Sequence, residues 1–282
     1  MLDISHAGEH VKDAVSFHLP FGKHIDLPLI DLGTLQVFGA EVPLRLQVTK
    51  FMVLELAAAV LMIMVFVPLA WRLRGGRAPR GRLTNLFEAM LEFIRNEVAR
   101  PAIGKHDADR FLPFLWTVFF FVLFCNLLGL IPWAGSPTGA LSVTGALAAM
   151  TFLTVVGAGM RQFGPFRYWL GLVPQMELPA AMAVILKPML FVIEVLGLLI
   201  KHSVLAVRLM ANMFAGHLVL AVILGFIAAV ADLWTILWVG VTVMSIVGQV
   251  ALNMLELFVA FLQAYIFTFL AALFIGMSVH EH

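Results

Sequence analysis

Charged side chains are scarce in this sequence, since Asp, Glu, Lys and Arg make up 12% of its 282 residues. A soluble domain usually carries about 25%, so the composition excludes an ordinary soluble fold. A single cysteine, Cys125, excludes a disulfide framework. The phosphate-binding pattern Gly-x-x-x-x-Gly-Lys-Ser/Thr is absent, so any ATP chemistry must belong to a partner. The net charge of +1 indicates nothing about nucleic acid, and we expect no such partner.

Apolar residues dominate instead, at 62% of the chain with a mean hydropathy of +0.99. Several apolar runs exceed the roughly 20 residues that a spanning helix needs, whereas a β-barrel would show short alternating segments. The sequence therefore predicts an all-α polytopic membrane protein. We expect one integral membrane domain, residues 48–282, with five spans at 48–71, 111–132, 141–160, 179–230 and 238–279.

Residues 1–47 precede the first span and are expected to form an extramembrane segment. Four histidines lie in this segment: His6, His10, His18 and His24. Their spacing fits no standard metal-ligand pattern, so we expect no metal site and no cofactor. The basic-then-apolar pattern of a cleavable signal is missing, and the first span is expected to act as the insertion signal.

Arginines gather in two loops and predict the orientation of the chain. The first loop carries Arg72, Arg74, Arg77, Arg80 and Arg82. Arg161 and Arg167 mark the next loop expected on the same side. Because basic loops stay in the cytoplasm, we expect the N-terminus outside and the C-terminus inside.

Residues 84–100 differ from the spans because they are amphipathic. Apolar side chains recur there at helical spacing, at Leu86, Met90, Phe93, Ile94 and Val98. Charged residues separate them, so this segment predicts a helix that lies at the membrane surface or against a partner helix.

The last two apolar runs are longer than a perpendicular span requires, so the helices must tilt or include non-spanning parts. They flank a break at residues 231–234 and predict an antiparallel hairpin. Arg208 and Gln263 have their midpoint at 235.5, and His217 and Glu256 have theirs at 236.5. Both midpoints lie next to the break that joins the two helices. The two residues of each pair are therefore expected at the same depth in the membrane.

This arrangement predicts proton chemistry inside the membrane. A buried arginine costs at least about 2.5–3.5 kcal/mol to insert and stays charged, so Arg208 is expected to serve a function. It can make an arriving carboxylate release its proton, and it can block a direct leak. Glu256 and His217 at one depth can hold and pass protons near neutral pH. Gln263 can orient Arg208 through hydrogen bonds.

Two motifs resemble subunit a of the F-type ATP synthases. They are AVRLMANMFAGH, residues 206–217, and NLLGLIP, residues 126–132. The resemblance covers residues 80–282, whereas the first 45 residues carry little of it. It implies a non-catalytic membrane stator that carries protons to and from a rotating c-ring. It also implies peripheral-stalk b-type subunits and membrane lipid as partners, and a place in the bacterial plasma membrane.

The same resemblance assigns roles to individual residues. Arg208 matches the essential arginine, and Gln263 matches the glutamine of the last helix. The outer proton path of the family uses a Glu/His pair, and here His217 and Glu256 stand in exchanged order, as in mitochondrial members. Asn212 and Glu194 also match family positions in the proton path.

Two other functions remain open from the sequence. A secondary transporter also places charges at the membrane midplane, but it usually shows internal repeats, and none is visible here. A third hypothesis is a scaffold protein in which the polar residues only contribute to packing. Copurification with a ring of small hairpin subunits would distinguish the stator from both.

Overall fold

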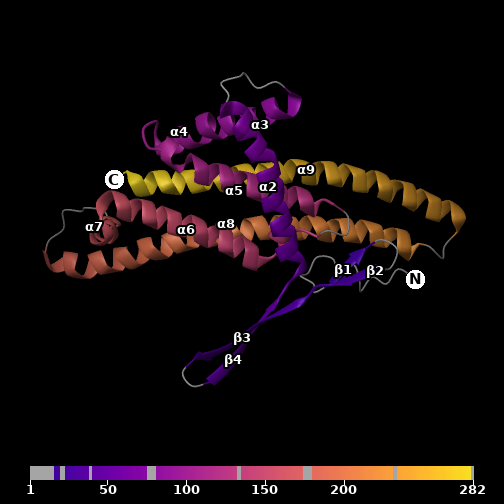
Figure 1. The fold of residues 1–282 in the computed structure, drawn as a ribbon, viewed down its shortest axis with the longest axis horizontal. Helices are drawn as coiled ribbons and strands as arrows, with labels where there is room; N and C mark the ends of the chain where they lie inside the picture. Colours follow the sequence, from indigo (N-terminus) through magenta and orange to yellow (C-terminus); the bar gives the residue numbers. More distant parts are fainter. Residues whose placement is uncertain are drawn as a thin grey trace. The chain divides into compact units, whose positions relative to one another are not determined.

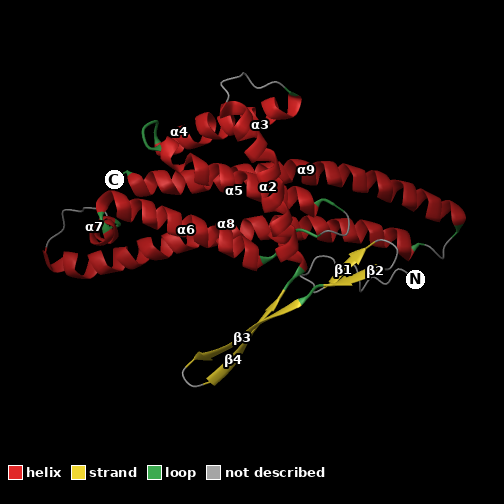
Figure 2. Cartoon of the chain, in the orientation of Figure 1, coloured by secondary structure: helices red, strands yellow, loops and turns green. Residues whose placement is uncertain are grey.

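The computed structural model describes residues 16–19, 23–37, 40–74, 81–131, 135–173, 180–230 and 234–280. Helices dominate this part of the chain (Figure 1), and strands occur only near its N-terminal end (Figure 2). The long helices are α2 (Lys50–Arg74), α5 (Ala108–Gly129), α6 (Leu141–Phe163), α8 (Ala180–Ala229) and α9 (Thr235–Val279). The short ones are α3 (Arg82–Phe93), the π-helical η1 (Ile94–Ala99), α4 (Arg100–Ile103), the 3₁₀ turn η2 (Pro137–Gly139) and α7 (Pro165–Gly171).

Five helices are long and apolar enough to cross a membrane, and they confirm the predicted all-α polytopic fold class. These candidate spans are Lys50–Trp71, Ala108–Gly129, Leu141–Phe163, Leu186–Ile227 and Thr235–Val279. The bounds of the five long helices agree with the predicted spans to within three residues. At about 1.5 Å per residue, α8 and α9 are each more than twice as long as the roughly 30 Å hydrocarbon core is thick.

The N-terminal segment contains two β-hairpins that the sequence reading did not predict. Strands β1 (Ser16–Leu19) and β2 (Lys23–Asp26) pair antiparallel, with His18 opposite His24. Strands β3 (Leu29–Val37) and β4 (Ala40–Gln47) pair in the same way, with an irregularity between Asp31 and Thr34. His6 and His10 lie outside the described residues. Among the described residues, no group of three or more His, Cys, Asp or Glu is placed to hold a metal ion.

The chain forms two compact units whose borders cut through the long helices. Unit 1 comprises Met1–Phe66, Phe121–Ala140 and Met210–Leu262, and unit 2 comprises Val67–Phe120, Leu141–Leu209 and Gln263–His282. Helices α2, α5, α8 and α9 therefore each contribute residues to both units. The predicted division at residue 47 separates extramembrane from membrane residues and remains a prediction.

In unit 2, the predicted surface helix is continuous through α3, η1 and α4 and is fixed to the start of α5. The Trp116 indole N–H donates to the Leu91 carbonyl at 3.0 Å. The Arg95 guanidinium donates two hydrogen bonds to the Asp109 carboxylate, at 3.0 and 2.8 Å. This amphipathic segment therefore packs against a spanning helix of the same chain.

The C-terminal end of α9 packs closely on neighbours in unit 2. A Cβ added at Gly276 would collide with the backbone of Ala102, so α9 and α4 touch backbone to backbone. The Ser278 hydroxyl donates to the Val155 carbonyl of α6 at 2.8 Å, and His280 bonds the Ile103 carbonyl at 2.7 Å. The basic residues predicted in loops lie partly in helices, since Arg72 and Arg74 end α2, Arg161 is in the last turn of α6 and Arg167 is in the short helix α7.

Candidate functional site

Arg208 lies on the exposed face of α8 in unit 2. An adjoining side of the helix is buried, since His202, Leu205 and Leu209 are 2–3% exposed. In the described part of the chain, Arg208 makes no hydrogen bond and no ion pair. A permanent positive charge is thus presented on the outside of an apolar helix, where another protein can approach it.

Arg208 ends a row of charged residues along α8. Lys187, Glu194, Lys201 and Arg208 follow one another at intervals of seven residues. Seven residues are nearly two turns, so successive members drift by only about 20° around the helix. Lys187 and Lys201 are exposed and Glu194 is half-buried. The row therefore forms one polar stripe on a helix that is otherwise almost entirely apolar.

Glu256 packs on the α8 backbone next to His217, within unit 1. A Cβ added at Gly216 would collide with the Glu256 carboxylate, so only glycine leaves room for this contact. The structure thus brings the carboxylate to the residue before His217. No hydrogen bond joins the two side chains, and Oε2 of Glu256 and Nε2 of His217 are both buried without a partner in the described structure. An acid and an imidazole that lack partners are available to bind water or a proton.

The packing of α8 against α9 agrees with the predicted register in unit 1 but is displaced from it in unit 2. In unit 1, Gly216 lies against Glu256, and the midpoint of this pair is residue 236. In unit 2, the rings of His202 and Phe274 have centroids 5.0 Å apart, and their midpoint is residue 238. The predicted mirror points were 235.5 and 236.5, so the pairing at Gly216 agrees with the prediction to within one residue, whereas the partner of His202 is displaced by three to five residues.

The remaining predicted residues are distributed over both faces of the helices. Gln263 is buried, with 5% of its surface exposed, and the structure forms no hydrogen bond between it and Arg208. Asn212 is exposed one turn after Arg208 in α8. Ala211 and Ala215 are exposed beside it, so the face around Arg208 carries small side chains that allow close approach.

A buried polar network in unit 1 was not assigned by the sequence reading. The Asn126 amide donates to the Ala260 carbonyl of α9 at 3.2 Å, and the Thr138 hydroxyl donates to Asn126 Oδ1 at 2.6 Å. Ser136 and Thr138 are joined by a hydroxyl hydrogen bond of 2.8 Å. Ala260 lies one turn after Glu256, so this network fixes the part of α9 that carries the carboxylate. In the sequence, the polar residues Ser136 and Thr138 just after a span could have indicated this network.

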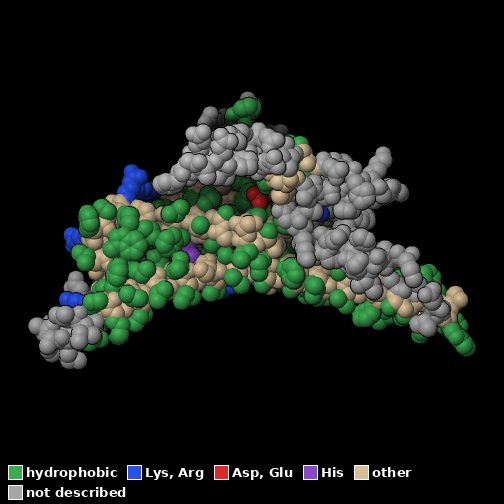
Figure 3. All heavy atoms as spheres, turned by 90° about the horizontal axis from the view of Figure 1, so that it is seen from below, with side chains coloured by type: hydrophobic (Ala, Val, Ile, Leu, Met, Phe, Trp, Pro, Cys, Tyr) green, Lys and Arg blue, Asp and Glu red, His purple; other side chains and the backbone are tan. Residues whose placement is uncertain are grey.

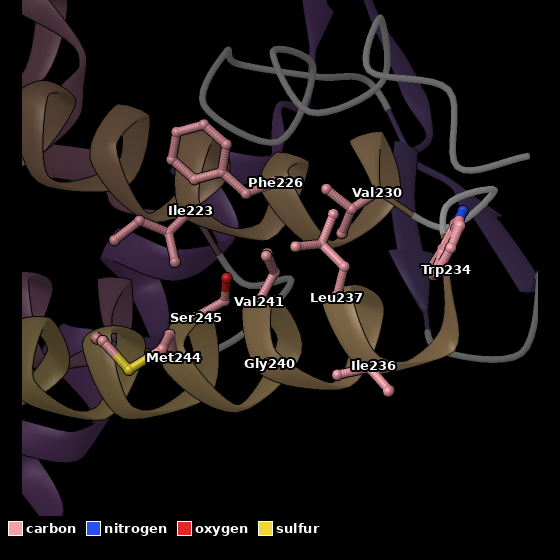
Figure 4. A pocket seen from close by; sticks show the side chains of 11 residues that line it. Ile223, Phe226, Val230, Trp234, Ile236, Leu237, Gly240, Val241, Met244 and Ser245 are labelled. Atoms are coloured by element: carbon pink, nitrogen blue, oxygen red, sulfur yellow. The ribbon is translucent and has the colours of Figure 1, made fainter.

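An apolar groove of about 880 Å³ opens between α8 and α9 near the turn that connects them. Figure 4 shows Ile223 and Phe226 of α8, and Val230 just after it, facing Leu237 and Val241 of α9, with Ser245 and the Trp234 indole as polar groups of the lining. Such a lining offers almost no group that can bind a proton. The groove is therefore not a candidate for proton chemistry. The better candidate is the contact between Gly216 and Glu256.

Comparison with known proteins gives the family. A family model described as ATP synthase A chain matches residues 52–276. ATP synthase subunit a of Myxococcus xanthus (strain DK1622) is 39% identical over 97% of this chain and 88% of its own length. That of Chloroherpeton thalassium (strain ATCC 35110 / GB-78) is 38% identical over 96% of this chain and 76% of its own. The chain belongs to the ATP synthase A chain family.

A third member of the ATP synthase A chain family, from Anaeromyxobacter sp. (strain Fw109-5), is 42% identical. This chain spans 55% of the length of that relative. The family match begins within α2, so it includes all five spans and every predicted site residue but not the two β-hairpins. Together with the five apolar helices, family membership makes this chain an integral membrane protein and a subunit of an ATP synthase.

Proposed function

We propose that this chain is the proton-translocating stator subunit of a rotary F-type ATP synthase. In this role it offers two aqueous half-channels to the carboxylates of a c-ring, while ATP is made by other subunits. Family membership supports the assignment to the complex. The observation that carries the mechanism is the exposed charge of Arg208 on an apolar, small-residue face of α8.

Arg208 is the group that acts on the ring. A ring carboxylate that approaches this charge in a medium of low dielectric is favoured in its ionised form, so it releases its proton. Because a guanidinium does not deprotonate, Arg208 cannot hand protons from one half-channel to the other. The same residue thus drives release and prevents a short circuit.

Glu256 and His217 form the outer proton path in this proposal. The contact of Glu256 with Gly216 supports it, because it brings an acid beside the helix segment that carries an imidazole. Glu256 Oε2 and His217 Nε2 lack protein partners, which leaves them able to exchange protons with water. Asn212 lies between His217 and Arg208 along α8, and Gln263 follows Glu256 by seven residues along α9, so both amides can hydrogen-bond passing water.

The inner path starts at the N-terminal half of α8. Glu194 and Lys201 continue the polar stripe from Arg208 toward the end of α8 that the arginine-rich loops predict to be inside. A polar stripe of this kind can hold water along the N-terminal half of the helix. The proton is the expected ion, since the imidazole of His217 favours it over sodium.

The partners in this proposal are the c-ring, which faces Arg208, and the peripheral-stalk b-type subunits. The membrane is the bacterial plasma membrane, with the N-terminus outside and the C-terminus inside.

Replacing Arg208 tests this function. In membranes that contain the assembled complex, Arg208→Ala should reduce ATP-driven proton pumping to background while the c-ring still copurifies. Arg208→Lys should rescue only in part, because an ammonium is a compact charge on a flexible stem. Arg82→Ala, which removes an exposed arginine of α3, is the control and should pump normally. Normal pumping by Arg208→Ala would refute the proposed mechanism.

A further inference from the structure

Helix α7 forms a small platform at one end of unit 2, where it joins α6 to the start of α8. Gly164 makes the turn out of α6 with φ of +90°. Tyr168 then packs back on α6, because a Cβ added at Gly159 would collide with its ring. On the other side, the rings of Trp169 and Phe191 lie 6.5 Å apart, which fixes α7 beside α8. The position of α7 between two spans is therefore set by aromatic packing.

The outer surface of this platform is both apolar and basic. Phe166 and Leu170 are 83% and 75% exposed, and they lie one turn apart on the same face of α7. Arg161 and Arg167 are exposed on either side of Gly164. Lys187 is exposed one turn before Phe191, on the part of α8 that meets α7. We call Arg161, Phe166, Arg167, Leu170 and Lys187 the α7 platform.

The segment that carries most of the platform contains no carboxylate of its own. Residues 141–173, which include all of α6 and α7, contain no Asp and no Glu. Glu177 lies outside the described residues, and Glu194 is seven residues beyond Lys187 along α8. On the face that Figure 3 shows, the visible Lys and Arg side chains gather mainly at one end of an otherwise hydrophobic surface.

The position of the platform along the spans indicates which partner it fits. Helix α6 ends at Phe163 and α8 begins at Ala180, so α7 belongs to the connection between two candidate spans, and such a connection lies at the bilayer surface. Exposed apolar side chains on a short helix enter the boundary between headgroups and acyl chains. Each Lys or Arg near an anionic bilayer increases binding by about fivefold. A phospholipid phosphate next to an acyl chain matches this combination, whereas a free anion would leave Phe166 and Leu170 in water.

We propose that the α7 platform binds an anionic phospholipid, with Arg161, Arg167 and Lys187 around the headgroup and with Phe166 and Leu170 among the acyl chains. This assignment depends on membrane insertion and not on the proton path, so the two proposals can fail separately. A platform variant that loses lipid but still pumps protons would support this proposal and leave the proposed proton path untouched. Lipid binding that does not change when these residues are replaced would refute this proposal alone.

Native mass spectrometry of the full-length chain in a mild detergent tests the proposal. The protein is mixed with phosphatidylglycerol or with phosphatidylcholine at equal concentration, and the lipid retained is measured. The wild type should retain phosphatidylglycerol preferentially. Arg161→Gln combined with Lys187→Gln should weaken that retention by about 25-fold and leave phosphatidylcholine unchanged. Phe166→Ser combined with Leu170→Ser should weaken retention of both lipids.

A matched control removes two exposed cations elsewhere in unit 2, with Arg82→Gln combined with Lys105→Gln. This variant should retain phosphatidylglycerol like the wild type. The proposal is overturned if the control loses as much lipid as the platform variant, or if the wild type shows no preference between the lipids. It is also overturned if millimolar inorganic phosphate displaces the lipid. Loss of another subunit from the assembled synthase, with lipid retention unchanged, would make the platform a protein contact instead.

Discussion

At the scale of single residues, the contact between Gly216 and Glu256 determines where the proposed outer path can run. Gly216→Ala would place a methyl group where the Glu256 carboxylate now packs, and the carboxylate is the flexible partner that must move. We therefore expect passive proton flux through membranes stripped of the catalytic head to fall several-fold. Thermal stability should change little, because the far end of a side chain can shift cheaply.

The matched control for this substitution is Gly225→Ala in the same helix, where a Cβ meets no atom within 4 Å. It should leave the flux unchanged. If both variants conduct like the wild type, the position of the Glu256 carboxylate is irrelevant to the path.

The exchange of His217 and Glu256 tests whether they act as a pair. Glu256→Ala should reduce passive proton flux severely, because no other carboxylate of α9 lies at that depth. His217→Ala should reduce it less if water replaces the imidazole. The double variant His217→Glu with Glu256→His restores one acid and one imidazole, so it should conduct better than Glu256→His alone. Non-additivity of this kind marks residues that share a network. An exchange variant no better than the single one would mean that the outer path lies elsewhere.

At the scale of secondary structure elements, close backbone contact holds the end of α9 on α4. Gly276→Ala would force a Cβ against the Ala102 carbonyl, which is backbone and cannot move aside. Overpacking of this kind typically costs about 1–3 kcal/mol, so we expect a lower melting temperature for the purified chain in detergent. Gly157→Ala in α6, where a Cβ meets no atom, should be neutral or slightly stabilising. Equal melting temperatures for the two variants would show that α9 can separate from α4 without cost.

The sequence predicted the long elements well and the short ones poorly. Run length and hydropathy define a spanning helix, so α2, α5, α6, α8 and α9 were found within a few residues of their bounds. In contrast, α7 has only seven residues, Arg167 among them, in a segment where a loop was expected. Strand β4 was missed although Ala40, Val42, Leu44 and Leu46 alternate with other residues, because Pro43 and the preceding glycine concealed the pattern.

For the candidate site, the sequence predicted the pairing of the two helices but not which side chains are exposed or buried. The antiparallel register followed from counting residues between polar positions, and the packing at Gly216 agrees with it. Counting along a helix does not tell which face is exposed when nearly every neighbour is apolar. The exposure of Arg208, the burial of Gln263 and the Asn126 network therefore came only from the tertiary structure.

At the scale of the whole molecule, the orientation in the membrane decides which half of the proposed path faces which compartment. The arginines of residues 72–82 and Arg161 with Arg167 predict that these segments lie inside. An odd number of spans then places the two termini on opposite sides, so the N-terminal hairpins are expected outside and His282 inside. The native Cys125 is buried and should react slowly. It is replaced by serine so that any labelling comes from the introduced cysteines.

Labelling with a membrane-impermeant maleimide on intact and opened cells tests this orientation. Arg77→Cys and His282→Cys should react only after the cells are opened, because both positions are expected in the cytoplasm. Gln36→Cys, in strand β3, should react in intact cells. Labelling of Arg77→Cys from outside would reverse the orientation, and Glu256 with His217 would then belong to the inner path. The arginine at position 208 would keep its role, since a charge that separates two half-channels acts the same way from either side.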